Sequence, residues 1–168
     1  MRRRTWVVGL AVLGGIGWYT FRPELLFVRK TVNEGLPVAA AQTASLGGPE
    51  GRMTAVLVQG QFKSIAHETR GTAAVYRLAD GSTVLRLTEF ATSNGPDVRV
   101  YLVAAPDASD NETVTRAGFV ELGKLKGTEG DQNYEIPAGL DLGKYRAVTI
   151  WCRRFSVNFA TAPLTPAS

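Results

Sequence analysis

The sequence predicts an all-β fold, an antiparallel β-sandwich of the jelly-roll or immunoglobulin-like kind, preceded by one N-terminal transmembrane helix. Three observations support this expectation: an uncharged apolar run near the N-terminus, a stretch of small and polar residues after it, and an apolar pattern of period two from Met53 onward. The chain is therefore expected to comprise a membrane anchor (1–22), a juxtamembrane segment and flexible tether (23–52), a folded domain (53–165) and a tail (166–168).

The predicted anchor is uncharged from residue 5 to residue 21, close to the lower limit of the roughly 17–25 residues that span a bilayer. Trp6, Trp18 and Tyr19 fit interfacial positions at its two ends. A cleaved signal peptide is the alternative, but no small-x-small cleavage site follows Phe21. The arginines at residues 2–4 favour an inside N-terminus, so we expect a single-pass protein of the cell membrane with its folded domain outside the cytoplasm.

Charge and composition exclude several function classes. The first thirty residues hold six basic side chains and one acidic one, a net charge of +5, whereas the whole chain carries +4, so the remaining residues carry −1 and the folded part is nearly neutral. A nearly neutral domain does not predict a nucleic-acid partner. The sequence has one cysteine and one histidine, which exclude an internal disulfide and a cysteine-rich zinc site, so no metal is expected.

Six strands are predicted from the alternating runs over residues 71–78, 83–90, 98–103, 119–125, 145–152 and 155–160. Asp80 and Gly81 lie between the first two and are typical of a hairpin turn. Residues 106–112 are interpreted as a polar surface loop, and no convincing amphipathic helix is found.

The run over residues 145–152 has a clear orientation. Val148, Ile150 and Cys152 share one face in regular alternation, and this is the face expected to lie inside. The other face holds Tyr145, Ala147, Thr149 and Trp151. Cys152 thus ends a strand beside the cationic pair at residues 153 and 154, and Trp151, Phe155 and Phe159 are expected to contribute to the packing.

Short segments spread over the folded part carry a family resemblance in their order and spacing. They are residues 60–62, His67 ahead of 71–73, 85–87 leading to Phe90, 94–97 followed by 100–102, 122–127, 130–134, 136–137, and 150–152 with Phe155. In these the chain resembles the DM-thirteen domain, a cell-surface module described as an electron-transfer domain, over residues 57–164. The membrane anchor and the residues just after it are similar to bacterial single-domain relatives.

The resemblance implies an extracytoplasmic β-sandwich whose cysteine, matched here by Cys152, is suspected of redox work. In animal relatives the domain accompanies domains that look like haem or sugar binders, and no such second domain is recognised in these residues. Any electron donor is therefore expected to be a separate protein.

Three side chains are the candidates for chemistry. Cys152 is an inert buried thiol, a reactive thiolate favoured by the neighbouring arginines, or half of an intermolecular disulfide. His67 is a base, a metal or haem ligand, or an ordinary surface residue. Asp97 is a catalytic carboxylate or part of a turn built by Asn94, Gly95 and Pro96.

No cofactor is evident, and a haem would need Met53, at the edge of the tether, as second ligand to His67. The expected function is a redox or electron-transfer role through the single cysteine, with the membrane bound through residues 5–21 and an unknown redox or cell-surface protein as partner. The alternative is a non-catalytic cell-surface binding or scaffolding module, and a self-contained enzyme ranks third.

Overall fold

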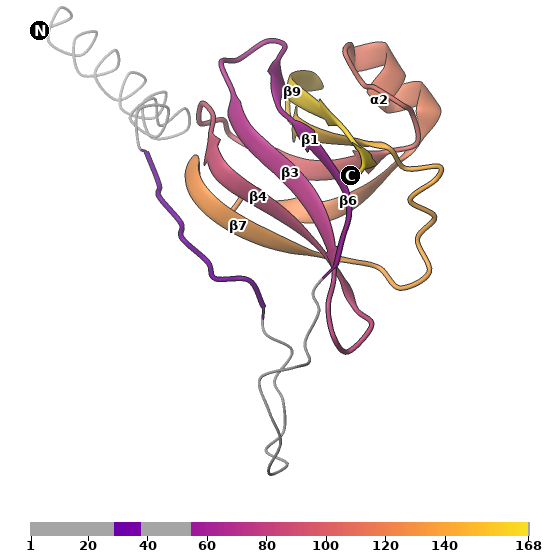
Figure 1. The fold of residues 1–168 in the computed structure, drawn as a ribbon. Helices are drawn as coiled ribbons and strands as arrows, with labels where there is room; N and C mark the ends of the chain where they lie inside the picture. Colours follow the sequence, from indigo (N-terminus) through magenta and orange to yellow (C-terminus); the bar gives the residue numbers. More distant parts are fainter. Residues whose placement is uncertain (1–28, 38–54, 168) are drawn as a thin grey trace, which may run out of the picture.

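The computed structural model describes residues 29–37 and 55–167, which contain a sandwich of two five-stranded antiparallel sheets (Figure 1). The first sheet has the order β10-β1-β3-β4-β7 and the second β2-β9-β8-β5-β6. The first holds β1 (Ala55–Gln61), β3 (Arg70–Arg77), β4 (Thr83–Ala91), β7 (Glu129–Ile136) and β10 (Thr165–Pro166). The second holds β2 (Lys63–Ser64), β5 (Val98–Val103), β6 (Phe119–Lys124), β8 (Ala147–Cys152) and β9 (Val157–Pro163).

The predicted all-β sandwich is confirmed. The predicted transmembrane helix at residues 5–21 lies outside the described residues. Within the part of the chain that the structure describes, no helix is long and apolar enough to cross a membrane.

The main core lies between the two sheets. It is built from the inward faces of β3, β4 and β7 on one side and of β5, β8 and β9 on the other. Val148, Ile150 and Cys152 all belong to this core, as the alternation of β8 predicts. Phe90 also points inward because a bulge near Glu89, with φ of 50°, shifts the alternation after Leu87.

A second apolar cluster covers the outer face of the second sheet. Trp151 and Ala147 of β8 lie there with Tyr101 and Val103 of β5, under the helix α2 (Asn111–Ala117). The interpretation of residues 106–112 as a surface loop was wrong at its end, because Asp110 caps this helix through its bond to the Thr113 amide at 2.7 Å. The helix buries Val114, which closes the cluster.

The predicted strands match in all six places, with small shifts at their ends. One packing prediction was wrong: Phe155 is 60% exposed, because the chain makes a turn over residues 153–156 in which Ser156 has a φ of 52°. The strand β9 therefore starts only at Val157. Phe159 and Trp151 are buried as expected.

The strand β7 was not predicted, because its sequence is largely polar. Its buried Gln132 is fully engaged: Oε1 accepts bonds from the Tyr134 hydroxyl at 2.8 Å and from the amides of Lys126 and Gly127, and Nε2 donates to the Gly127 carbonyl.

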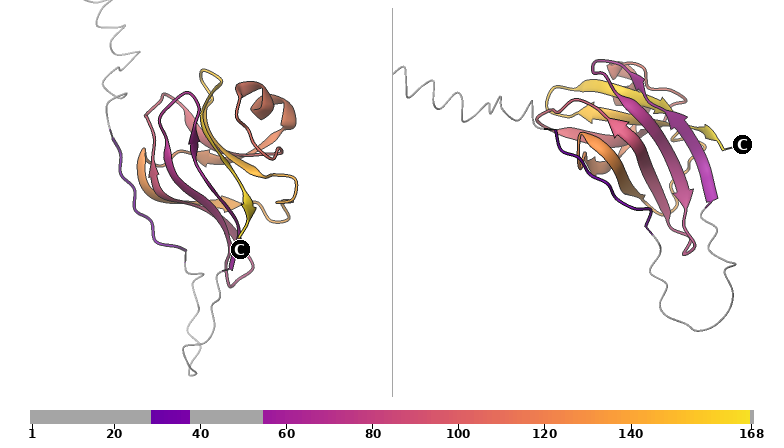
Figure 2. Two further views of the ribbon diagram at one scale, coloured as in Figure 1. Left: turned by 45° about the horizontal axis from the view of Figure 1, so that its top comes forward. Right: turned by 60° about the vertical axis from the view of Figure 1, so that its left-hand side comes forward.

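Residues 29–37, which the sequence placed in the juxtamembrane tether, lie along β7 (Figures 1 and 2). We call this segment the strap. It pairs in parallel with β7 through a bridge between Thr31 and Glu129. The strap therefore covers the edge of the first sheet, which would otherwise offer free backbone groups.

Candidate functional site

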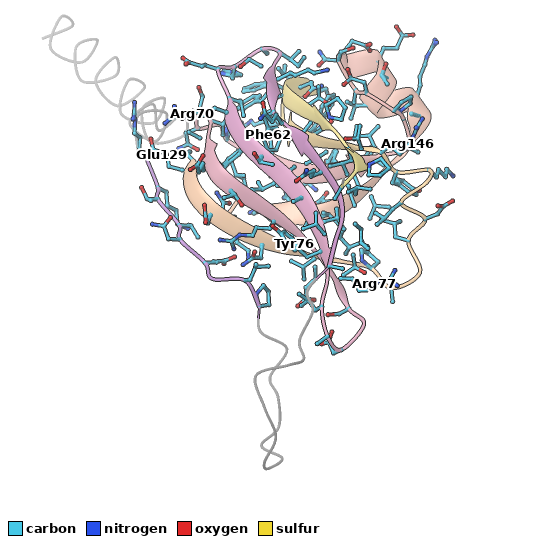
Figure 3. All side chains as sticks on the ribbon, in the orientation of Figure 1. Phe62, Arg70, Tyr76, Arg77, Glu129 and Arg146 are labelled. Carbon is cyan, nitrogen blue, oxygen red and sulfur yellow. The ribbon has the colours of Figure 1, made fainter. Side chains whose placement is uncertain are left out.

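One end of the sandwich gathers the three residues that the sequence singled out. We call it the Cys152 end and define it by residues 65–69, 92–97, 125–128 and 152–156, together with the start of the strap. Backbone bonds join these segments: the Ile65 amide donates to Phe159, Thr92 to Thr128, Leu125 to Val98 and Arg153 to Asp97. Figure 3 shows Arg70 and Glu129 near this end and Arg77 near the opposite end.

Cys152 is the last residue of β8, and its side chain lies in the main core at 1% exposure. Its partners across the sheet are Val98 of β5 and Val157 of β9. The thiol is free in the structure. At this depth the sulfur is out of reach of any reagent or partner while the core stays closed.

Phe159, Val98 and the backbone of Gly95 pack together at this end of the core. A Cβ on Gly95 would lie 2.7 Å from Val98 Cγ2 and 3.1 Å from Phe159 Cζ, so only glycine lets the loop pack this closely. Both side chains belong to the same core cluster as Cys152. We call Gly95, Val98 and Phe159 the cap, because they pack tightly at the end of the sandwich that holds the sulfur.

His67 lies on the same end in the loop between β2 and β3 and is half-buried. Its ring rests on the ring of Phe159, with centroids 3.8 Å apart and planes inclined by 35°. The His67 amide donates to the Phe159 carbonyl at 3.3 Å, which fixes the loop against β9. Phe159 thus contacts the only histidine of the sequence from within the core that holds its only cysteine.

Asp97 connects the turn before β5 with the turn that follows Cys152. Its Oδ1 accepts a bond from Arg99 Nε at 2.6 Å and its Oδ2 one from Arg153 Nε at 2.9 Å. Glu121 completes the cluster, 2.6 Å from Arg99 and 3.7 Å from Arg153. We call these four residues the latch, because they tie the turn after Cys152 to the turn before β5.

The contacts within the latch determine the charge state of Asp97 and the direction in which the charge of Arg153 is used. The hydrogen bond from Arg99 lowers the pKa of Asp97, with a smaller contribution from Arg153, against the opposing effect of burial. Asp97 is thus an anion at neutral pH with both oxygens engaged. Arg153 in turn has its positive charge matched by two carboxylates rather than directed at the thiol.

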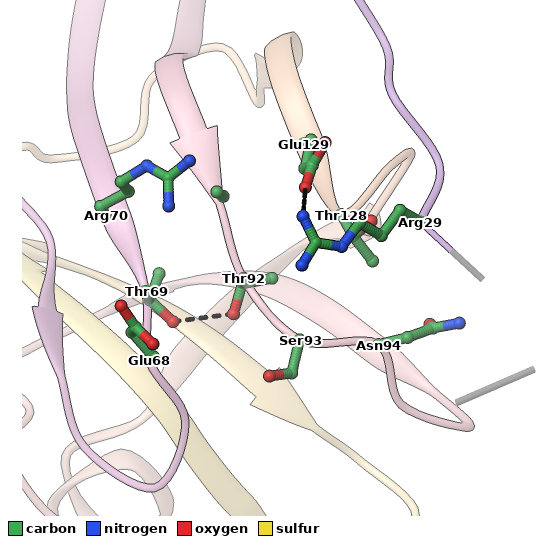
Figure 4. Close-up of a pocket in the computed structure, with 10 residues that line it drawn as sticks. Arg29, Glu68, Thr69, Arg70, Thr92, Ser93, Asn94, Thr128 and Glu129 are labelled. Carbon is green, nitrogen blue, oxygen red and sulfur yellow. Dashed lines mark hydrogen bonds and ion pairs between the residues drawn. The ribbon is translucent and has the colours of Figure 1, made fainter. Parts of the chain in front are cut away.

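Next to the cap, a hollow of about 300 Å³ opens between the strap and the ends of β3 and β4 (Figure 4). Arg29 and Arg70 extend toward it from opposite sides. Arg29 pairs with Glu129 at 3.0 Å, and the hydroxyls of Thr69 and Thr92 bond to each other at 2.7 Å. The lining is polar, so the hollow is suited to water or a polar group.

Residues 29–37 and 55–167 hold no group of three or more His, Cys, Asp or Glu side chains that would bind a metal ion. Met53, the residue considered as a second haem ligand, lies outside the described residues. The haem prediction therefore stays a prediction that rests on the sequence.

Sequence reasoning missed Phe159 as the residue that His67 contacts, the latch residues Arg99 and Glu121, and the strap. The alternation of β5 does place Arg99 on the face opposite to Val98 and Val100, but it does not indicate a partner. Contacts between segments so distant in the chain leave no local pattern.

Comparison with known proteins agrees with the resemblance. The family model described as Electron transfer DM13 matches residues 61–164, which include Cys152, His67 and Asp97. No curated protein and no solved structure matches the chain. Because the match covers more than half of the sequence, the chain belongs to the Electron transfer DM13 family.

Proposed function

We propose that this member of the Electron transfer DM13 family is anchored in the cell membrane through residues 5–21, with its sandwich outside the cytoplasm, and that Cys152 is the group that changes oxidation state. One observation carries the cysteine part of the proposal. The only thiol and the only imidazole of the sequence lie at one end of the fold, where the His67 ring rests on Phe159, a member of the same core cluster as Cys152.

The chemistry open to a lone thiol is exchange with a partner's disulfide. The sulfur of Cys152 bonds to one sulfur of the partner, the partner's S–S bond breaks, and the thiol proton passes to the departing sulfur. This step needs contact between sulfurs. The cap of Gly95, Val98 and Phe159 must therefore open first, and the latch is what holds it closed.

The depth of Cys152 favours a second candidate function, a binding or scaffolding module without redox chemistry. At 1% exposure among aliphatic side chains, the thiol also fits the role of a small core residue. In that case the outer surface of the Cys152 end, rather than its sulfur, meets the partner.

The two functions differ in how they depend on the sulfur. Cells carrying the wild-type chain, Cys152→Ala or Cys152→Ser would be compared for the rate at which they reduce an external disulfide such as a pyridyl disulfide. The redox proposal predicts that both substitutions abolish the contribution of this protein, because neither alanine nor serine exchanges with a disulfide.

Val148→Ala is the matched control, since Val148 lies on the same face of β8 and is equally buried. It should keep the activity at matched protein level. Full reducing activity in Cys152→Ala would contradict the redox proposal and favour the binding module. An equal loss of activity in Val148→Ala would show that the assay reports the stability of the domain and not the chemistry of the thiol.

A further inference from the structure

The strap pairs with β7 through backbone hydrogen bonds. The Val32 amide donates to the Glu129 carbonyl at 2.9 Å, the Glu34 amide to Asp131 at 2.9 Å, and the Glu129 amide returns a bond to Lys30 at 3.2 Å. Alternating bonds of this kind fix both the register and the direction of the strap.

Side chains add to this backbone pairing. The Glu34 carboxylate receives Lys126 Nζ at 2.9 and 3.0 Å and the Asn133 amide at 2.8 Å. Burial raises the pKa of Glu34, but these donors outweigh it and the pKa lies below its usual range. Arg86, which is largely buried, donates to the Glu34 carbonyl at 2.8 Å.

Two glycines make room for the strap. A Cβ on Gly130 would lie 2.1 Å from the Val32 carbonyl oxygen, and one on Gly127 would lie 2.5 Å from that of Lys30. Any side chain at either position pushes the strap away from β7. The close approach is therefore specific to this sequence, and it can be broken by a single methyl group.

The strap begins at the Cys152 end. Arg29 lines the same hollow as Glu68, Thr69 and Asn94 (Figure 4). The apolar run ends at residue 21, so residues 22–28 separate it from the strap, and seven residues reach at most about 25 Å. A membrane anchor at residues 5–21 thus keeps the Cys152 end within about 25 Å of the bilayer.

The surface of this end suits a lipid headgroup layer. Phe155 at 60% and Ile65 at 40% exposure are two of the four large apolar side chains exposed within the described residues. Arg154, Arg70 and Arg29 are exposed around them, and Arg29 reaches 83%. The acidic groups here are Glu68 and Glu89, which are exposed, Glu129, paired with Arg29, and the two carboxylates of the latch.

We propose that the strap mounts the domain with its Cys152 end against the anionic surface of the membrane, where Phe155 and Ile65 enter the headgroup layer and the arginines meet lipid phosphates. This rests on the anchor of the proposed function. What the proposal adds is the orientation of the domain. Because the Cys152 end then faces the bilayer, a redox partner of Cys152 lies in or on the same membrane.

The test uses the full chain in vesicles of phosphatidylcholine and phosphatidylglycerol. A fluorophore is attached at Phe155→Cys or, at the opposite end, at Ser82→Cys, both in a Cys152→Ala background, and lipids with a quencher near the headgroup are added. We expect loss of fluorescence at position 155, none at position 82, and a weaker loss in vesicles of phosphatidylcholine alone.

Gly130→Ala should release the strap and reduce the quenching at position 155. Gly139→Ala is its matched control, because both glycines have positive φ, 95° and 78°, but a Cβ on Gly139 meets nothing within 4 Å. Amide exchange of the unsubstituted chain provides a measurement without variants, in which vesicles should slow exchange over residues 153–156 but not over 79–82.

The possible failures are distinguishable. A chain that an alkaline wash removes from the vesicles would contradict the anchor itself. A chain that stays in the vesicles while both labels remain equally unquenched would leave the anchor standing and overturn the mounting. Shielding of position 155 only in native membranes, and not in vesicles, would mean that a protein covers this end and would also overturn the proposal.

Discussion

The two ends of the sandwich are held together in different ways. At the end away from Cys152, two exposed turns are closed by neighbours in the sequence: Asp80 accepts from the Ser82 amide at 2.8 Å, and Asp141 from the Gly143 amide at 2.8 Å. At the Cys152 end the contacts join distant segments, such as Asp97 with Arg153 and Arg29 with Glu129.

This difference indicates which end can respond as a unit. A turn closed by its own residues can be lost without effect on other segments, whereas the Cys152 end depends on contacts among the strap, the cap, the latch and the loop of His67. Weakening one of these should loosen the cover over the sulfur. The substitutions below are ordered from the largest expected effect to the smallest.

Phe159→Ala should have the largest effect, because the ring is 3% exposed and both the core and His67 pack on it. We expect a loss of about 3–5 kcal/mol in the free energy of unfolding, measured with denaturant. Phe155→Ala, four residues away and exposed, should change it by less than about 0.5 kcal/mol. Equal effects would contradict the described packing of the turn.

Asp97→Asn should have an intermediate effect. It removes the charge that pairs with Arg99 and Arg153, and partial exposure of the cluster limits the loss to about 1 kcal/mol. Denaturant unfolding of the two proteins at neutral pH gives the difference. A variant with the same free energy of unfolding as the wild type would mean that the latch does not stabilise the fold.

The wild type and Asp97→Asn should also differ in how their stability depends on pH. Because the pKa of Asp97 is lowered on folding, its ionised form stabilises the fold above the unfolded value of about 3.9, and this contribution is lost as the pH falls through the folded pKa. The stability difference between wild type and Asp97→Asn should therefore be constant near neutrality and shrink in acid. A difference that grows in acid would contradict this sign.

Asp80→Asn should have the smallest effect. Hydrogen bonds from Ser82 lower the pKa of Asp80, but the contact stays within one exposed turn and reaches no other segment. Its substitution should leave the amide exchange of residues 65–69 and 94–97 unchanged. Faster exchange there would show that the two ends are coupled and would remove the contrast between them.

The sequence predicted the parts of the fold that depend on local alternation. The run 98–103 is found as β5 without a shift, and the assignment of Ile150 and Cys152 to the inner face of β8 is confirmed. Both follow from the period of two, which is preserved wherever one face is buried.

The parts that were missed depend on partners far along the chain. The strand β7 did not look apolar because its inner Gln132 is satisfied by Tyr134 and the amides near Lys126, and the strap is held largely through backbone groups. Phe155 was wrongly placed because alternation was extended across a turn. His67 and Cys152 were selected for their chemistry, while the packing of His67 on Phe159 and the place of all three residues at one end of the fold appear only in three dimensions.

The central claim is that the Cys152 end opens as a unit and thereby exposes the sulfur. The most direct measurement is the labelling rate of Cys152 under native conditions in the wild type, Asp97→Asn and Asp80→Asn, with a pyridyl disulfide reagent. Loss of about 1 kcal/mol of closing energy predicts labelling about fivefold faster in Asp97→Asn and unchanged in Asp80→Asn. The free energy derived from each labelling rate is compared with the free energy of global unfolding of the same protein, and the account predicts that it is smaller. Equality of the two values in all three proteins would contradict the claim and leave Cys152 as a residue of the core.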